Sequence, residues 1–155
     1  LSVLEAVEEA NARQKLVVGI KLARELGSFA GRHVAVWGLA FKANTDDMRE
    51  ASSLALVAGL LAAGAEIRAY DPVARAEAAK IFSGEPRISL VDSAASALDG
   101  CDALCIVTEW QEFRNPNFER IKSMMHQPVI FDGRNICDPA QLRKLRFTYY
   151  SVGRA

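Results

Sequence analysis

The sequence lacks the features that mark several large classes of protein. Its three cysteines, Cys101, Cys105 and Cys137, form no C-x-x-C pair, so we expect neither a disulfide framework nor a metal site. The formal net charge is zero, which argues against a nucleic-acid-binding surface. The longest apolar stretch, residues 54–65, contains two glycines and is too short to cross a membrane. No signal peptide is visible, and these absences predict a cytoplasmic protein without metal, nucleic acid or membrane partners.

Two common phosphate-binding fingerprints are also missing. Neither G-x-G-x-x-G nor G-x-x-x-x-G-K-[ST] occurs in the chain, so neither a usual dinucleotide loop nor a P-loop is predicted. Instead, residues 34–50, VAVWGLAFKANTDDMRE, join an apolar run of strand length to a polar loop that carries Lys42 and Arg49. Loops at the carboxyl ends of strands bind ligands in open α/β sheets, and two cations favour an anionic ligand such as a phosphate. A solvated loop that caps the next helix is the alternative.

Strand-like and helix-like segments alternate along the chain. Strands are expected near residues 33–37, 66–70, 87–90, 102–108, 129–131 and 147–152. Helices are expected between them, including one over residues 52–63 and one over residues 116–125 that Pro116 opens. This alternation predicts an α/β fold with a Rossmann-like, doubly wound, mostly parallel sheet and helices on both faces.

A long helix is expected before the first strand. Residues 1–26 carry an apolar stripe at helical spacing, with acids before bases, and Gly27 is a plausible end. The first half of this helix is far from the rest of the domain in sequence. We therefore expect it to pair with a second copy, although packing wholly within one domain is the alternative. The chain divides into residues 1–27 and a domain of residues 28–155.

Four motifs occur in order along the chain. They are G-L-A-F-K-x-x-T-D-D-x-R-E at 38–50, Y-D-P at 70–72, V-T-E-W at 107–110 and F-D-G-R-N at 131–135. In this order they resemble the C-terminal, UDP-binding domain of the UDP-glucose/GDP-mannose dehydrogenase family. One departure is that the family usually continues R-E-S, whereas Ala51 follows Glu50 here, which puts one hydrogen bond at the start of the helix in doubt.

The resemblance implies a role within a larger enzyme. Family members bind NAD in an N-terminal domain and oxidise a sugar alcohol to a carboxylate in two NAD-dependent steps, through a thioester on a cysteine. That cysteine lies in a glycine-rich motif before a central helix, and neither this motif nor the dinucleotide fingerprint occurs here. The chain is therefore expected to be the C-terminal domain with the end of a central dimerisation helix, residues 1–27. Alone, it should be inactive and contain no catalytic residue.

The resemblance also assigns roles to particular residues. Phe41 and Lys42 match residues that contact the nucleotide sugar, and Arg134 matches an arginine that contacts the substrate. Arg49 matches an arginine that reaches the NAD bound by the other domain. Because Arg134 also follows a predicted strand, it should lie at the same edge as Lys42. Asp71 ends the second strand, where a dinucleotide-binding unit would hold a ribose, but without a glycine fingerprint we expect only a strand-end cap or a turn residue.

The sequence constrains the identity of the sugar less closely than it constrains the family. Within the family, the T-E-W and F-D-G-R runs favour UDP-glucose as the substrate of a homodimeric enzyme. A domain that serves GDP-mannose or UDP-N-acetylmannosamine is the first alternative. A stand-alone nucleotide-binding or oligomerisation module without chemistry is the second.

Overall fold

The computed structural model describes residues 28–49 and 51–152. The helix expected over residues 1–26, and the pairing of two copies through it, lie outside the described residues. So does the boundary expected at residue 27. Within the described part of the chain, no helix is long and apolar enough to cross a membrane.

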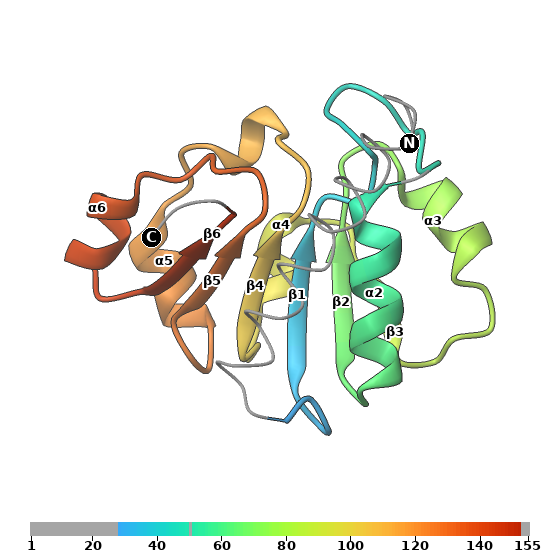
Figure 1. Cartoon of the computed structure of the whole chain (residues 1–155), viewed down its shortest axis with the longest axis horizontal. Helices are drawn as coiled ribbons and strands as arrows, with labels where there is room; N and C mark the ends of the chain where they lie inside the picture. The colour runs from blue at the N-terminus through green and yellow to red at the C-terminus, as the bar shows by residue number, and fades with distance from the viewer. Residues whose placement is uncertain (1–27, 50, 153–155) are drawn as a thin grey trace, which may run out of the picture.

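The described residues form one parallel sheet of six strands (Figure 1). The strands are β1 (His33–Trp37), β2 (Glu66–Tyr70), β3 (Ile88–Leu90), β4 (Ala103–Ile106), β5 (Val129–Asp132) and β6 (Thr148–Ser151). Their order is β3-β2-β1-β4-β5-β6, and each neighbouring pair is parallel. The Rossmann-like, doubly wound α/β fold is confirmed, and the sheet is wholly parallel.

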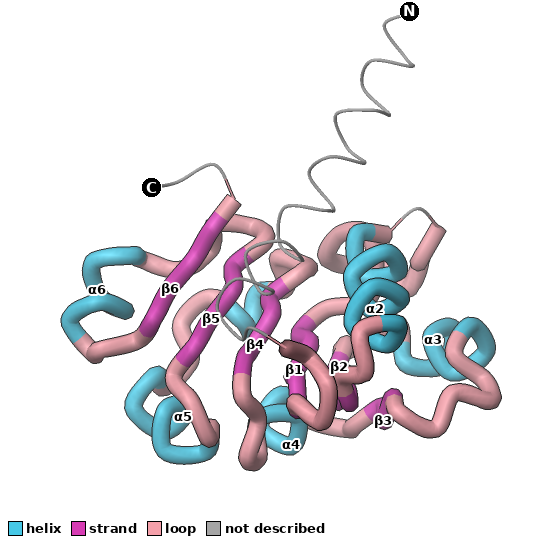
Figure 2. Tube along the Cα trace, turned by 60° about the horizontal axis from the view of Figure 1, so that its bottom comes forward, coloured by secondary structure: helices cyan, strands magenta, loops and turns pink. Residues whose placement is uncertain are grey.

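Helices cover both faces of this sheet, as expected. One face is covered by α2 (Ser52–Ala62) and α3 (Arg75–Ile81), and the other by α4 (Ala94–Leu98), α5 (Phe118–Met124), α6 (Pro139–Lys144) and the 3-10 helix η1 (Gln111–Phe113). In Figure 1, α2 lies in front of the sheet and α4 behind it, and Figure 2 shows the same layers after rotation. Every residue of β4 and β5 is buried, which explains why these strands are continuous apolar runs.

The start of two helices depends on how the first free N–H groups are satisfied. The expectation that Pro116 opens α5 was wrong, because α5 begins at Phe118 and the Asn117 side chain accepts a hydrogen bond from the Arg120 N–H. Proline cannot accept such a bond, so asparagine takes the cap position. At α2, the N-cap residue is Ala51, which makes no side-chain cap. The loss of a hydrogen bond expected at this position is therefore confirmed.

The end of β1 passes very close to the end of β4. Gly38 has a φ of 97°, and a Cβ atom added there would lie 2.5 Å from both Cβ and Oγ1 of Thr108. An L-residue at Gly38 would therefore meet both an unfavourable backbone conformation and a steric clash. This contact also explains why β4 is shorter than the expected strand over residues 102–108, since Thr108 turns to the loop that follows Gly38.

We predict that Gly38→Ala lowers the free energy of unfolding by about 3 kcal/mol or more. The left-handed backbone costs about 1–2 kcal/mol, and overpacking adds about 1–3 kcal/mol. The measurement is urea unfolding of the purified variant. The matched control is Gly59→Ala in α2, where an added Cβ meets no heavy atom within 4 Å and should stabilise by about 0.5–1 kcal/mol. Equal stability of the two variants would contradict the close contact between Gly38 and Thr108.

Candidate functional site

Loops from neighbouring strands converge at the carboxyl edge of the sheet, which is at the top in Figure 1. The segment of residues 39–41 follows β1, and its backbone N–H groups all have acceptors. Leu39 N and Ala40 N donate to Oδ2 of Asp71 at 2.8 and 3.0 Å. Phe41 N donates to the carbonyl oxygen of Asp47 at 2.9 Å. The segment is therefore fixed from one side by the end of β2 and from the other by its own loop.

The carbonyl groups of residues 39–41 are bonded as well. The Leu39 carbonyl accepts from the Ser53 hydroxyl at 2.6 Å, and the Ala40 carbonyl from the Thr108 hydroxyl at 2.7 Å. The Phe41 carbonyl accepts from Nη2 of Arg134 at 2.6 Å. All six polar backbone groups of the segment are thus satisfied by protein, so it is a rigid support for the side chains that it carries. The sequence alone had indicated no such hydrogen-bonding role for Ser53 or Thr108. The sequence feature that could have pointed to a close contact at Thr108 was Gly38, which lies opposite it.

The Asp71 carboxylate connects three loops at this edge. Its Oδ2 atom accepts from the N–H groups of Leu39 and Ala40, as described, and also from the indole Nε1 of Trp110 at 3.1 Å. Its Oδ1 atom accepts from the N–H groups of Val73 and Ala74 at 2.9 and 2.8 Å. Asp71 is only 3% exposed. The expected strand-end cap is confirmed, and the links to Trp110 and to the loop after β1 are additional.

Arg134 lies beside this segment, as its position after β5 led us to expect. Its Nε donates to the Val107 carbonyl at 2.9 Å, and its Nη2 donates to the Phe41 carbonyl. The Glu109 Oε2 atom lies 3.2 Å from the same Nε and has no hydrogen-bond partner among the described residues. About a third of the Arg134 side chain is exposed. Its guanidinium therefore joins β4 to the loop after β1 and still faces the surface.

Phe41 and Lys42 project from this support. Phe41 is 36% exposed, and the Lys42 ammonium lies 5.2 Å from the centroid of its ring, within the range of a cation–π contact. Among the described residues, Lys42 forms no ion pair within 4 Å, whereas Arg134 is paired with Glu109. The edge thus presents an aromatic ring, one unpaired cation and one paired cation. Together these groups suit a ligand that has both a planar and an anionic part.

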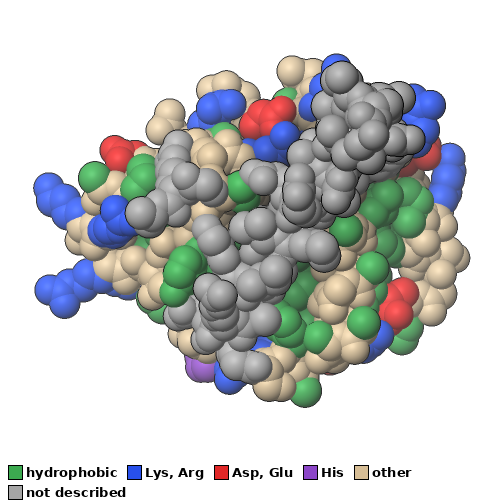
Figure 3. Space-filling view, in the orientation of Figure 1, with side chains coloured by type: hydrophobic (Ala, Val, Ile, Leu, Met, Phe, Trp, Pro, Cys, Tyr) green, Lys and Arg blue, Asp and Glu red, His purple; other side chains and the backbone are tan. Residues whose placement is uncertain are grey.

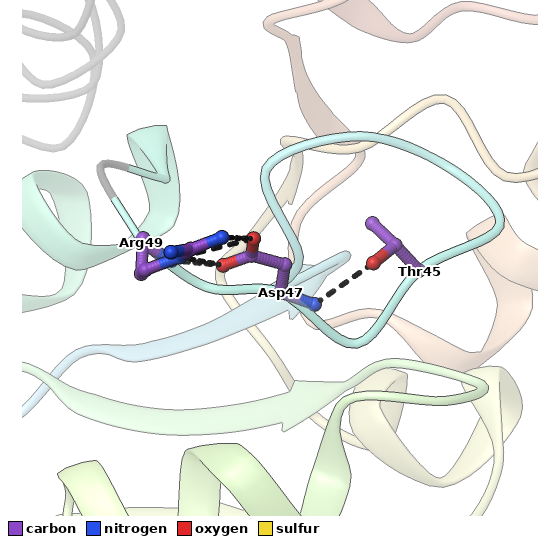
Figure 4. A network of polar contacts seen from close by, with 3 residues as sticks. All are labelled: Thr45, Asp47 and Arg49. Atoms are coloured by element: carbon purple, nitrogen blue, oxygen red, sulfur yellow. Dashed lines mark hydrogen bonds and ion pairs between the residues drawn. The ribbon is translucent and has the colours of Figure 1, made fainter.

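Arg49 lies further along the same loop and is held by Asp47 (Figure 4). Its Nε and Nη2 donate to the carboxylate at 3.0 and 2.7 Å, and Thr45 Oγ1 accepts from the Asp47 N–H at 3.1 Å. The hydrogen bonds from Arg49 lower the pKa of Asp47 to about 2. Lys42 also lowers the pKa of Asp47 through its charge. Direct contacts join Phe41 to Lys42 and to Arg134, whereas the Arg49 side chain is bonded to Asp47 and is 89% exposed.

The three cysteines do not present a reactive thiol at this edge. The cysteine thiols are buried, and burial raises the pKa of Cys101 to about 12 and also raises the pKa of Cys105. The described part of the chain holds no cluster of histidine, cysteine and acidic residues that could bind a metal ion. The raised pKa values make Cys101 and Cys105 weak nucleophiles.

The chain is similar to known proteins over most of its length. A family model described as the UDP-glucose/GDP-mannose dehydrogenase family, UDP binding domain, matches residues 35–139. A UDP-glucose 6-dehydrogenase of Pseudomonas aeruginosa is 46% identical over 98% of this chain and 34% of its own length. The UDP-glucose 6-dehydrogenase TuaD of Bacillus subtilis is 38% identical over 97% of this chain and 32% of its own. The chain thus spans about a third of the length of these relatives.

Two solved structures have the same fold over most of the chain. One is a UDP-glucose dehydrogenase from the archaeon Pyrobaculum islandicum, with a TM-score of 0.81, 29% identity and coverage of 97% of this chain and 32% of that one. The other is a UDP-D-ManNAc dehydrogenase from Pyrococcus horikoshii, with a TM-score of 0.72, 28% identity and coverage of 95% and 31%. The likeness thus includes enzymes named for different sugars.

We predict that the Asp47 carboxyl titrates with a midpoint near pH 2 and that Arg49→Ala moves the midpoint upwards towards 3.8, its ordinary value. Because the folded-state pKa is lowered, the pair contributes fully above pH 3.8 and its contribution is lost as the pH falls through about 2. The measurement is NMR titration of the side-chain carboxyl. Arg120→Ala on α5 is the control and should leave the midpoint unchanged. A midpoint near 3.8 in the parent protein would contradict the bidentate pair.

Proposed function

Because the chain belongs to the UDP-glucose/GDP-mannose dehydrogenase family, we propose that it is the C-terminal, UDP-binding domain of a UDP-glucose 6-dehydrogenase. The observation that carries this proposal is the 39–41 segment, which holds Phe41 and Lys42 beside Arg134 at the carboxyl edge. The relatives with the highest identities given above are named for UDP-glucose. A domain serving UDP-N-acetylmannosamine is the alternative, since one structural relative is named for that sugar.

Phe41, Lys42 and Arg134 would each contact a different part of the nucleotide sugar. Lys42 would supply an uncompensated point charge to the diphosphate. Phe41 would offer an apolar ring to a planar or sugar face. The Arg134 atoms Nε and Nη2 are already bonded to backbone carbonyls, so mainly its Nη1 hydrogens are left for a ligand. Arg134 would thus act both as a support for Phe41 and as a substrate contact.

The oxidation itself would be performed outside this chain. Conversion of UDP-glucose to UDP-glucuronate adds one water and removes two hydrides and three protons; two NAD molecules would accept the hydrides, and the protons would pass to solvent. We assign no NAD site to the described residues, because the loop after β1 has one glycine and Asp71 faces inward. Arg49, whose side chain is 89% exposed, could reach an NAD held by another domain once it leaves Asp47.

We predict that Lys42→Ala weakens binding of UDP-glucose on the order of tenfold or more. A hydrogen bond to a charged group contributes roughly 1.5–3 kcal/mol, and 1.4 kcal/mol corresponds to tenfold in affinity. The measurement is an NMR titration of the 155-residue chain, which detects weak binding. Lys144→Ala at the end of α6 removes an exposed lysine far from this edge and is the control. If Lys42→Ala binds as tightly as the parent chain, the loop after β1 is not the ligand site.

We predict that the 155-residue chain alone produces no NADH from UDP-glucose and NAD. The reason is that the described residues provide neither a reactive cysteine nor a dinucleotide site. The measurement is absorbance at the NADH band, and the longer protein that we propose carries this chain is the positive control. NADH formation by the chain above a blank would overturn this assignment.

Pairing of two copies through residues 1–27 belongs to the same proposal, and sedimentation of the chain as a monomer would count against it.

A further inference from the structure

We infer that Asp71 is a positioning residue for the ligand site, which sets the pose of Phe41 and Lys42 without touching the ligand. This inference rests on the proposed function, because it concerns the same site. In a usual dinucleotide-binding fold, the acid at the end of the second strand accepts hydrogen bonds from a ribose. The contacts of Asp71 assign it a different task here.

Both oxygens of Asp71 are fully occupied by protein donors. Five N–H groups donate to them at 2.8–3.1 Å, three to Oδ2 and two to Oδ1. A carboxylate has about four lone-pair positions, so no acceptor capacity is left for a ribose hydroxyl. The 3% exposure of Asp71 also excludes direct contact with a ligand at the surface. The residue therefore acts on a ligand only through the groups that it holds.

Those groups lie directly before the ligand-facing side chains. Leu39 and Ala40 are 1% and 2% exposed, so without Asp71 their N–H groups would be buried and unpaired. Phe41 and Lys42 follow at once in the chain, and any shift of the two preceding peptides changes where these side chains point. Ser53 and Thr108 still hold the carbonyl groups of this segment. Loss of the carboxylate should therefore alter the pose of the segment rather than detach it.

Trp110 adds a second connection through the same atom. Its indole N–H donates to Oδ2 of Asp71, and Trp110 comes directly after Glu109, which is paired with Arg134. Asp71 thus links the loop that carries Lys42 with the loop that supports Arg134. Asp71 is therefore one of the groups that set the separation between Lys42 and Arg134, together with the direct hydrogen bond from Arg134 to the Phe41 carbonyl.

The test compares two buried carboxylates at opposite edges of the sheet. Asp71→Asn replaces one acceptor oxygen by an NH₂ group, which cannot accept from the N–H groups that face it. Asp102→Asn is the matched control, because Asp102 is 5% exposed and accepts from His33 N, His126 and Gln127 at the amino edge. Both variants should be less stable than the parent. Only Asp71→Asn should weaken UDP binding, about tenfold, in NMR titrations at a temperature where both are folded.

A second ligand separates positioning from contact. The same titrations are repeated with 2′-deoxy-UDP, which lacks one ribose hydroxyl. If Asp71 positions the loop, Asp71→Asn weakens UDP and 2′-deoxy-UDP by the same factor, within about twofold. If Asp71 binds the 2′-hydroxyl of the ribose, the effect of the substitution disappears with 2′-deoxy-UDP, and the inference is wrong. The inference is also wrong if folded Asp71→Asn binds UDP with the parent affinity.

A milder pair of variants decides the matter if Asp71→Asn does not fold. Trp110→Phe removes one donor from Asp71, and Trp37→Phe removes an indole N–H that donates to the Ala94 carbonyl on the α4 face. We expect Trp110→Phe to weaken UDP binding about two- to fivefold and Trp37→Phe to leave it unchanged. Equal affinities in the two variants would overturn the inference. Lys42→Ala is measured alongside, because parent affinity in that variant would instead remove the proposed site itself.

Discussion

The buried carboxylate of Asp71 and the loops around it depend on one another. A charge that is 3% exposed is tolerated only when donors surround it, and here the five donors come from three segments, which follow β1, β2 and β4. Conversely, the N–H groups of Leu39 and Ala40 have no other acceptor within the described residues. Sheet topology brings the segments to one edge, but hydrogen bonding to this carboxylate determines how they are arranged there.

A second buried carboxylate, Asp132, orders the loop at the end of β5 in the same way. Asp132 is 1% exposed, and it accepts from the Arg134 N–H through Oδ1 and from the Cys137 N–H and the Tyr149 hydroxyl through Oδ2. Asp71 therefore fixes the loop that carries Lys42, while Asp132 fixes the turn that carries Arg134. The two cations come to one edge of the sheet from separate strands, and a buried acid orders the loop after each strand. The side chains that we propose as ligand contacts are thus carried by loops whose backbone is held in place although they lie at the surface.

The sequence predicted the elements well where one physical signal dominates. The run Val34–Trp37 and the helix from Ser52 follow from apolar patterning alone, and the edge that Lys42 and Arg134 share follows from their places after parallel strands. The hydrogen bond from Arg134 to the Phe41 carbonyl spans 93 positions and depends on two turn geometries that no local pattern encodes. For Asp71, the pattern identified a strand-end acid. Whether such an acid faces a ligand or the protein is decided by the surrounding N–H groups, which only the folded chain brings together.

The arrangement of charge at the carboxyl edge affects how a ligand would approach. Basic and acidic side chains lie side by side along the top of the molecule in Figure 3. Arg49 forms a close ion pair with Asp47, and Arg134 forms one with Glu109. The electric field of such a pair falls off over a short distance. The exposed Asp46 also lies near Lys42 in the chain. Long-range electrostatic steering of a ligand needs a surplus of charge of one sign at the surface. An anion would therefore gain little attraction during diffusion, and salt would affect its capture less than at a strongly basic phosphate site.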